Sequence, residues 1–383
     1  MPNIQRPIWE SEVEYWALDV ERSTLNAQDG NHALVRLIRA EIENRGPMSF
    51  ARFMHQVLYH PEHGYYSSGR CAIGRNGDYF TNVSVGPLFG QLLCAQFAEI
   101  WERLGKINNF VIVEQGAHDG QFAHDVLESA QKRAPEFFAA LRYRMVEPFP
   151  VLRERQARTL EPFREKIEYS DSLQPFVGVH FSNELLDAMP VRLIRDGVEK
   201  FVDLEGDKFV LVECPLSREA AAFNQPVLDW IDDVAGNLQR GYVIAVDYGR
   251  LGAEFQASVQ VRAQHRSLDS PFEQIGHADL TMQVDWSSIL ERARANGLRI
   301  AGFTDQYHFL AGIISELGRV DSSQSLLADL PKTKRELQTL LHPEMLGRAF
   351  QVLTLGKNVG AGATRLAGFK FAREVRSALS NSE

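Results

Sequence analysis

The 383-residue chain has little cysteine, with only Cys71, Cys94 and Cys214. None of them lies in CxxC spacing, which disfavours a structural zinc site or a disulfide framework and fits a reducing compartment. No apolar run reaches the roughly 18 residues that a membrane span needs. The first residues, MPNIQRPIWESEVEYW, lack the apolar region of a signal peptide. We therefore expect a cytoplasmic protein without membrane insertion.

The chain also lacks an excess of positive charge. It carries 50 Asp and Glu against 41 Lys and Arg, a net charge of −9. Proteins that bind nucleic acid are more often basic, so nucleic acid is not expected as a partner. Three histidines at 55, 60 and 63 lie close to Glu62, but HPEHGYY is more typical of a turn, and no metal site is expected.

What the chain does contain is an alternation of buried strands and amphipathic helices. We expect strands at 110–114, 142–147, 178–183, 242–247 and 349–357, with helices at about 121–133 and 149–160. This order predicts an α/β fold with a doubly wound, mostly parallel sheet. Ligands of such sheets bind at the edge formed by the carboxyl ends of the strands.

The first of these strands runs into a glycine turn, VIVEQGAHDGQF. A phosphate-binding P-loop needs a lysine after its last glycine, and none follows Gly120. The dinucleotide pattern GxGxxG also fails, because only its first glycine is present. The S-adenosylmethionine (SAM) turn of class I methyltransferases, ExGxGxG, is matched by Glu114, Gly116 and Gly120, with His118 in place of the middle glycine. A plain turn between a strand and a helix is the alternative.

Two further acids follow this turn in the order expected for a SAM site. Glu147 closes the second strand, where a rigid carboxylate can accept both ribose hydroxyls of a nucleoside. Asp171, in YSDSL, lies where a loop after the next strand would meet the adenine amine. We expect the turn and these two acids to bind SAM together.

The stretch FSNELLDAMPVRLI at 181–194 resembles the signature of the MidA-like family of SAM-dependent methyltransferases. Further stretches that resemble the family are HPEHGYY, GDYFT, PLFGQLL, AVDYG, ADLTMQVDW and FQVLTLGK. Together they cover about residues 33–357. The family includes the mitochondrial complex I assembly factor that methylates an arginine of a respiratory-chain subunit. The resemblance implies a class I, Rossmann-like methyltransferase fold with an insertion over the active-site edge.

The resemblance also implies roles for residues outside the glycine turn. Asp78, Thr81 and Asn183 are expected to help bind the cofactor. His265, with Asp279 and Asp285, is a weaker catalytic set. Glu184 and Asp187 follow a strand that ends at the ligand edge, so we expect these acids to orient the methyl acceptor. Capping of a short helix by Asn183 or Asp187 is the alternative.

The chain departs from the family pattern around the predicted pocket. His118 and Asp119 replace a glycine and an arginine of the turn, and Ser84 replaces a glutamate. The basic run around His265 is reduced to SVQVRAQHR. These changes affect the expected substrate side more than the cofactor side, because the acids remain.

We expect the following organisation: an N-terminal helical region and cofactor-covering loop (1–86), a SAM-binding core (87–250) with a β insertion at about 191–215, a helical substrate-side insertion (251–345), a final core strand (346–357) and a basic tail (358–383). The expected function is SAM-dependent methyl transfer to a protein side chain, with arginine and, by analogy, a respiratory-chain subunit as acceptor. A SAM-binding assembly protein and a small-molecule O- or N-methyltransferase are the alternatives.

Overall fold

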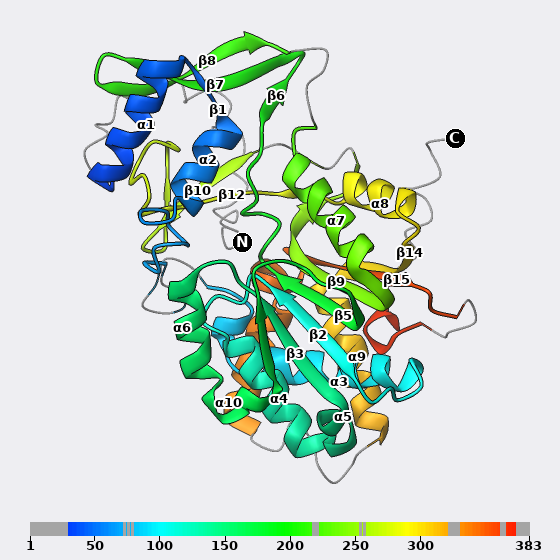
Figure 1. The fold of residues 1–383 in the computed structure, drawn as a ribbon. Helices are drawn as coiled ribbons and strands as arrows, with labels where there is room; N and C mark the ends of the chain where they lie inside the picture. Colours follow the sequence, from blue (N-terminus) through cyan, green and yellow to red (C-terminus); the bar gives the residue numbers. More distant parts are fainter. Residues whose placement is uncertain are drawn as a thin grey trace, which may run out of the picture.

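The computed structural model of the protein describes residues 30–71, 74, 77, 80–216, 222–252, 255, 258–320, 330–360 and 365–372. Asp78 lies outside the described residues. The described chain forms a core built on a large sheet and a smaller lobe, which lies above the core in Figure 1.

The core sheet has eight strands in the order β14-β15-β9-β5-β2-β3-β4, with β13 paired to the end of β9. The pairs β2–β3, β2–β5, β3–β4 and β5–β9 are parallel, whereas β15 runs antiparallel to β9 and β14. The strands are β2 Phe110–Gln115, β3 Leu141–Val146, β4 Ile167–Ser170, β5 Phe176–Asn183, β9 Leu238–Arg250, β13 Val284–Asp285, β14 Arg299–Asp305 and β15 Phe350–Lys357. Because parallel strands end at the same edge, β2, β3, β5 and β9 present their carboxyl ends together.

Helices cover both faces of this sheet, since alternate strand residues point into two apolar cores. Ile112 and Phe181 pack into one core, and Val111 and Val113 into the other. The first core is covered by α3 Leu88–Arg103, α4 Gln121–Arg133, α5 Pro135–Ala140, α9 Gln306–Val320 and α10 Leu330–Leu341, and the second by α7 Gln225–Asn237 and α8 Trp286–Ala295. Strands that are apolar on both faces are typical of a parallel sheet.

The smaller lobe, called the cap lobe below, comes from three separate stretches of the chain. These are α1 His32–Arg45, β1 Met48–Ser49 and α2 Phe50–Tyr59; then β6 Leu193–Arg195, β7 Val198–Glu205 and β8 Lys208–Pro215; then β10 Val259–Ala263, β11 Arg266–Leu268 and β12 Asp279–Met282. All strand pairs within the lobe are antiparallel. Their apolar side chains form a third core of their own, which includes Phe53, Val202 and Val261.

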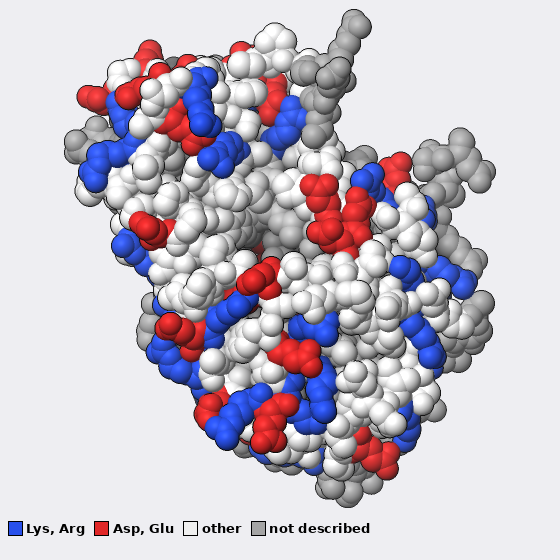
Figure 2. All heavy atoms as spheres, viewed as in Figure 1, with Lys and Arg blue, Asp and Glu red and all other residues white. Residues whose placement is uncertain are grey.

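Hydrogen bonds join the cap lobe to the ligand edge of the core. Tyr59 Oη donates to the carbonyl oxygen of Ala188 at 3.1 Å, and the Met282 N–H donates to the carbonyl oxygen of Asp187 at 2.8 Å. The surface is hollowed between the two lobes, and acidic side chains gather over α7 on one side of the hollow (Figure 2). The cap lobe is therefore fixed directly over the edge where ligands of this fold bind.

The expected class I methyltransferase fold is confirmed by this sheet order and by the solved structures described below. Residues 191–215, expected as a β insertion, lie in β6, β7 and β8. The stretch 251–345 differs from the expected helical insertion, because it contains β10–β12 of the cap lobe and a core strand, β14. Residues 365–372 of the expected tail pack on the core, with Phe369 buried. No helix in the described part of the chain is long and apolar enough to cross a membrane.

Candidate active site

The turn between β2 and α4 contains three residues with positive φ: Gly116 at 77°, His118 at 47° and Gly120 at 81°. Glycine adopts this region freely, and histidine is among the residues that enter it more readily than most others. A Cβ on Gly116 would lie 3.2 Å from the Leu185 side chain, and one on Gly120 would lie 3.3 Å from Leu160. The turn is thus tight at both glycines, and His118 has a positive φ of the kind that glycine adopts freely.

The His118 side chain points toward the cap lobe. Its Nε2 atom lies 3.4 Å from the carbonyl oxygen of Cys71, and its Nδ1 atom lies 3.7 Å from Oδ1 of Asp119. Burial acts to lower the pKa of the imidazole, but the Asp119 carboxylate and the Cys71 side chain outweigh it and raise the pKa to about 10. The structure therefore places a cationic side chain where the sequence lacks the third glycine, and this side chain links the turn to the cap lobe.

Glu147 follows β3 at the same edge and is almost fully buried. Its carboxylate accepts hydrogen bonds from the Phe149 N–H at 2.9 Å and from Nε2 of Gln156 at 3.1 Å. Burial raises the pKa of Glu147. Among the described residues, no partner reaches two further buried oxygens, Gln156 Oε1 and Ser170 Oγ at the end of β4. Unpaired polar atoms beside a strand-end carboxylate suit the hydroxyls and amine of a nucleoside, so this edge fits SAM.

Two of the acids expected to bind the cofactor have protein partners in the structure. Glu114 is 4% exposed, and its Oε2 accepts a hydrogen bond from Tyr143 Oη at 2.6 Å. Burial raises the pKa of Glu114 to about 8. Asp171 is largely exposed and forms an ion pair with Arg153. Their roles at the cofactor site stay predictions.

Thr81 and Asn183 lie together at the end of β5, on either side of Asn82. Thr81 Oγ1 accepts a hydrogen bond from the Ser84 N–H at 3.1 Å, and Ser84 Oγ accepts one from the Thr81 N–H at 2.8 Å. Asn183 Oδ1 accepts from Asn82 Nδ2 at 2.9 Å, and Asn183 Nδ2 donates to Glu184 Oε1 at 2.8 Å. Ser84, noted as a departure in the sequence, thus closes a local turn that packs against the predicted catalytic segment.

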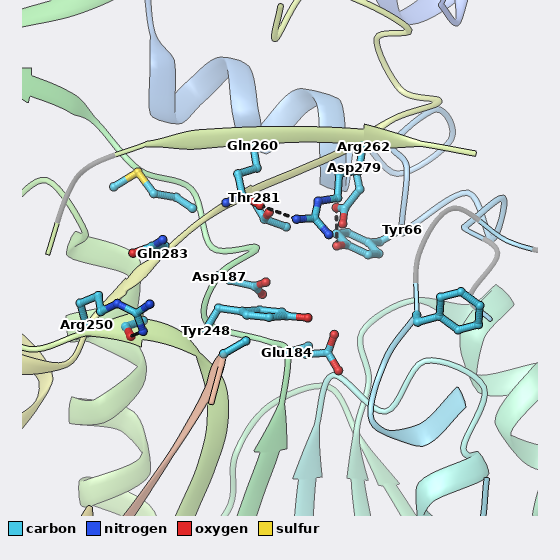
Figure 3. Close-up of a pocket in the computed structure, with 14 residues that line it drawn as sticks. Tyr66, Glu184, Asp187, Tyr248, Arg250, Gln260, Arg262, Asp279, Thr281 and Gln283 are labelled. Carbon is cyan, nitrogen blue, oxygen red and sulfur yellow. Dashed lines mark hydrogen bonds between the residues drawn. The ribbon is translucent and has the colours of Figure 1, made fainter. Parts of the chain in front are cut away.

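A pocket of about 240 Å³ lies between the ligand edge and the cap lobe (Figure 3). Its core side is formed by Glu184 and Asp187 after β5 and by Tyr248 to Arg250 at the end of β9. The cap-lobe side is formed by Tyr66 and by residues of β10 and β12. The pocket brings together Glu184 and Asp187, as the sequence predicts.

The loop that carries these two acids is held by Asp247 near the end of β9. Asp247 Oδ2 accepts the backbone N–H groups of Leu185, Leu186 and Asp187 at 3.1, 2.8 and 3.4 Å. Glu184 has a positive φ of 53°, and its N–H donates to the Val246 carbonyl oxygen at 3.0 Å. A backbone held in this sparsely populated region by its surroundings is common at functional sites.

The pocket acids favour the protonated state when no cation is present. Burial and the nearby Asp247 raise the pKa of Glu184 to about 8. Burial and repulsion from Asp247, Asp279 and Glu184 hold the pKa of Asp187 well above its usual range. Asp247 keeps its negative charge more readily than Asp187, because it accepts several backbone N–H groups. A cation entering the pocket would favour the ionised form of these acids.

A third acid, Asp279, faces them from the cap lobe. It is the first residue of β12 and is 4% exposed. Its Oδ1 accepts a hydrogen bond from Tyr66 Oη at 2.6 Å and from the Leu280 N–H at 2.9 Å. The sequence did not assign Tyr66 or Asp247 to the site, and it gave Asp279 only as part of a weaker set with His265 and Asp285. The strand-end acid of AVDYG was an available signal for Asp247, but no local pattern pairs Tyr66 with Asp279.

His265 does not join these acids. It lies at the exposed tip of the β10–β11 hairpin with a φ of 59°, and its ring contacts Phe80 at a centroid distance of 5.0 Å. The structure therefore places this histidine in a turn against Phe80, a residue of the pocket lining, and its catalytic role stays a prediction. No group of three or more histidine, cysteine or acidic side chains in the described ranges is arranged to hold a metal ion.

The glycine turn and the strand-end acid Glu147 lie beside an acidic pocket. A match to a protein family agrees with this geometry. A family model of S-adenosyl-L-methionine-dependent methyltransferases matches residues 92–304, which is more than half of the chain. The chain belongs to this family. The protein is a SAM-dependent methyltransferase, and SAM is its cofactor.

The relatives of this methyltransferase extend over most of its length. It is 27% identical over 384 residues to the mitochondrial protein arginine methyltransferase NDUFAF7 homolog of Drosophila melanogaster, covering 86% of each chain. It is 26% identical to the human mitochondrial protein arginine methyltransferase NDUFAF7, covering 90% of this chain and 86% of that one. A crystal structure of a Burkholderia thailandensis superfamily member bound to S-adenosyl-homocysteine shares 28% identity and a TM-score of 0.78, covering 90% of this chain and 96% of that chain.

One expectation is corrected by these relatives. The cytoplasmic location inferred from the first residues is wrong on this comparison, because the curated relatives of the methyltransferase, including those of fly, mouse and human, are mitochondrial proteins.

Proposed function

We propose that this methyltransferase transfers the methyl group of SAM to an arginine side chain of a protein. The observation that carries the proposal is the convergence of the buried acids Asp187 and Asp279 and the partly buried Glu184 on one pocket at the ligand edge (Figure 3). The names of the fly and human relatives, both protein arginine methyltransferases, support it.

A guanidinium group would supply the positive charge and the N–H donors that these acids lack. Buried carboxylates that face one another repel when ionised, and they need a cation or a proton between them. A guanidinium offers five N–H donors in a planar fork that matches carboxylate geometry. A neutral acceptor would leave the acids protonated, whereas an arginine would bind with release of protons from the pocket.

When bound, SAM supplies an electrophilic methyl group on a sulfonium, with S-adenosylhomocysteine as the leaving group. The acceptor nitrogen forms the new N–C bond as the S–C bond breaks, and it must lose one proton. Glu184 is suited to accept this proton, because the pKa of its carboxyl, about 8, lies near neutral pH. Asp187 and Asp279 orient the other nitrogens, and Asp247 positions the loop that carries Glu184.

The cofactor side uses a different set of residues. Glu147 is proposed to accept the ribose hydroxyls, and Gly116, His118 and Gly120 to shape the turn against the methionine part. Asn183 and Thr81 keep the end of β5 in place. A respiratory-chain subunit is the protein class that we propose as acceptor, on the resemblance alone.

The test is transfer from labelled SAM into a mitochondrial protein extract by wild type, Glu184→Gln and Asp187→Asn. Wild type should place label on arginine, and each variant should lower turnover by about 10²-fold, because orientation acts on the barrier. Asp233→Asn, an exposed acid on α7, is the matched control and should behave as wild type. Label found only on small molecules, or equal label from all variants, would contradict the proposal. Calorimetry with S-adenosylhomocysteine checks that the variants still bind the cofactor product.

A further inference from the structure

Tyr248 lies near the end of β9 and lines the pocket beside the predicted catalytic acids. Its N–H donates to Asp247 Oδ1 at 2.8 Å, and Asp247 also holds the loop that carries Glu184 and Asp187. The Tyr248 ring packs on Phe350 of β15 with a centroid distance of 3.9 Å. The core therefore fixes both the backbone and the ring of Tyr248 relative to the acids.

The hydroxyl of Tyr248 takes no part in this packing. Within the described part of the chain it has no hydrogen-bond partner, although Tyr248 lines the pocket. Figure 3 shows the ring extending into the pocket with its hydroxyl on the side of the Glu184 carboxylate. A phenylalanine would pack on Phe350 in the same way, so the contacts of the ring do not account for the hydroxyl. The hydroxyl is therefore available to a ligand of the pocket.

Glu184 also keeps one oxygen for the pocket. Its Oε1 atom accepts the Asn183 side-chain N–H at 2.8 Å and the Asn82 backbone N–H at 3.2 Å. Among the described residues no hydrogen bond uses Oε2, and none joins Glu184 to Tyr248. A carboxylate oxygen accepts hydrogen bonds, and a phenol oxygen can accept them as well. Two such oxygens that line one pocket without bonding each other can both bind a nitrogen placed between them.

The charges around Tyr248 keep its hydroxyl protonated. Burial and, next, the charge of Glu184 raise the pKa of Tyr248 well above its ordinary value, which agrees with their placement in Figure 3. Asp187 and Asp247 act in the same direction, and the opposing effect of Arg262 does not outweigh them. The phenol is therefore neutral near neutral pH, and the lone pairs of its oxygen can accept an N–H group.

We propose that Tyr248 is a catalytic residue whose hydroxyl oxygen binds the reacting nitrogen of the acceptor together with Glu184. This inference rests on the proposed arginine acceptor and assigns a second contact to its reacting nitrogen. A terminal guanidinium nitrogen carries two N–H groups in the plane of the group. When Tyr248 Oη and Glu184 Oε2 accept one N–H each, the plane is fixed and a face of the nitrogen is left for in-line attack on the methyl group.

The bond changes remain those of methyl transfer. The N–C bond forms as the S–C bond breaks, one proton of the nitrogen passes to Glu184, and Tyr248 keeps its own proton. Charge balances, because the sulfonium becomes a neutral thioether, the Glu184 carboxylate becomes a carboxylic acid and the acceptor remains a guanidinium cation. Tyr248 thus contributes orientation of the acceptor, and its hydroxyl should matter for turnover and acceptor binding rather than for cofactor binding.

Tyr248→Phe tests the hydroxyl alone, because the ring and its contact with Phe350 remain. The initial rate of arginine labelling in the mitochondrial protein extract at saturating SAM should fall about tenfold. Binding of a blocked Gly-Arg-Gly peptide to the S-adenosylhomocysteine complex, measured by calorimetry, should also weaken about tenfold. Affinity for S-adenosylhomocysteine itself should change less than about twofold, because the hydroxyl contacts the acceptor. Tyr242→Phe is the matched control and should behave as wild type, since Tyr242 lies on the same strand but does not line the pocket.

A double variant shows whether Tyr248 and Glu184 bind the same nitrogen. In the Glu184→Gln background, Tyr248→Phe should lower the rate less than about threefold, because two groups that hold one atom are energetically coupled. A loss through disturbed packing alone would be the same in both backgrounds.

The outcomes separate this inference from the proposed function. A wild-type rate in Tyr248→Phe, or a full tenfold loss in both backgrounds, overturns the role of Tyr248 and leaves arginine as the acceptor. A lower rate with an equal loss of S-adenosylhomocysteine affinity overturns that role as well, because the variant then acts through the cofactor. Wild-type protein that neither labels arginine nor binds the peptide contradicts the proposed function and this inference together.

Discussion

The hydrogen bond between Tyr66 and Asp279 gives the sharpest quantitative prediction. Tyr66 belongs to the loop after α2, and its hydroxyl lies 2.6 Å from a carboxylate that faces the pocket. If Asp279 binds the acceptor, Asp279→Asn removes one charge-assisted contact of about 1.5–3 kcal/mol, which lowers kcat/KM by about 10- to 150-fold. Tyr66→Phe removes a supporting hydrogen bond of about 1 kcal/mol, so kcat/KM should fall by about fivefold.

The double variant distinguishes a positioning role from an independent one. If Tyr66 acts only through Asp279, Tyr66→Phe should cost less than twofold when Asp279 is already Asn. The assay is methyl transfer from labelled SAM to an arginine acceptor, with dissociation constants for S-adenosylhomocysteine as the control. These constants should stay within twofold of wild type, because both residues lie on the cap-lobe side. Full activity of Asp279→Asn would refute this reasoning. An equal loss of kcat/KM on Tyr66→Phe in wild type and in Asp279→Asn would refute it as well.

Three further predictions concern the other acids. Glu184 is protonated in the free pocket below about pH 8, so kcat/KM for a cationic acceptor should rise through that pH and level off, and Glu184→Gln should abolish the rise. Glu147→Gln should weaken S-adenosylhomocysteine binding at least tenfold by calorimetry, and unchanged affinity would remove Glu147 from the cofactor site. Glu114 has a folded-state pKa of about 8 against an ordinary 4.5, so its contribution to stability is fully present below pH 4.5 and is lost as the pH rises to 8. Urea unfolding at pH 5, 6.5 and 8 should therefore show that the free energy of unfolding depends less on pH in Glu114→Gln than in wild type. An equal dependence on pH in the two proteins would contradict the raised pKa of Glu114.

The central strands could be predicted because their pattern of apolar residues lies within each strand itself. The runs FVIVE and YVIAVD are apolar on both faces, which indicates a buried parallel strand without knowledge of its neighbours. The strand β14, with the sequence RIAGFTD, carries no such pattern, because among the described strands it is an edge strand that pairs only with β15, and it contains Arg299 and Gly302. Its identity as a strand depends on a partner about 50 residues further along the chain.

The same distinction applies to the site. Glu184 and Asp187 lie in one short motif, so their proximity could be predicted from the sequence. Tyr66 and Asp279 are 213 residues apart, and only the folded cap lobe brings them together. His265 lies at a hairpin tip with a left-handed backbone, a position that its place in the sequence did not reveal, and its predicted catalytic role stays untested.

The assembly of the cap lobe from three separate stretches has a consequence for folding order. Its hydrophobic core combines residues near Phe53, Val202 and Val261, which are distant in the chain. Bringing such segments together from an open chain has a high entropic cost, which falls once the core sheet already holds their ends close. The cap lobe should therefore fold after the core sheet and unfold before it. Hydrogen exchange in β7 and β10 would then be faster than in β2 and β5, so that acceptor binding can be lost by local unfolding while the cofactor half stays intact.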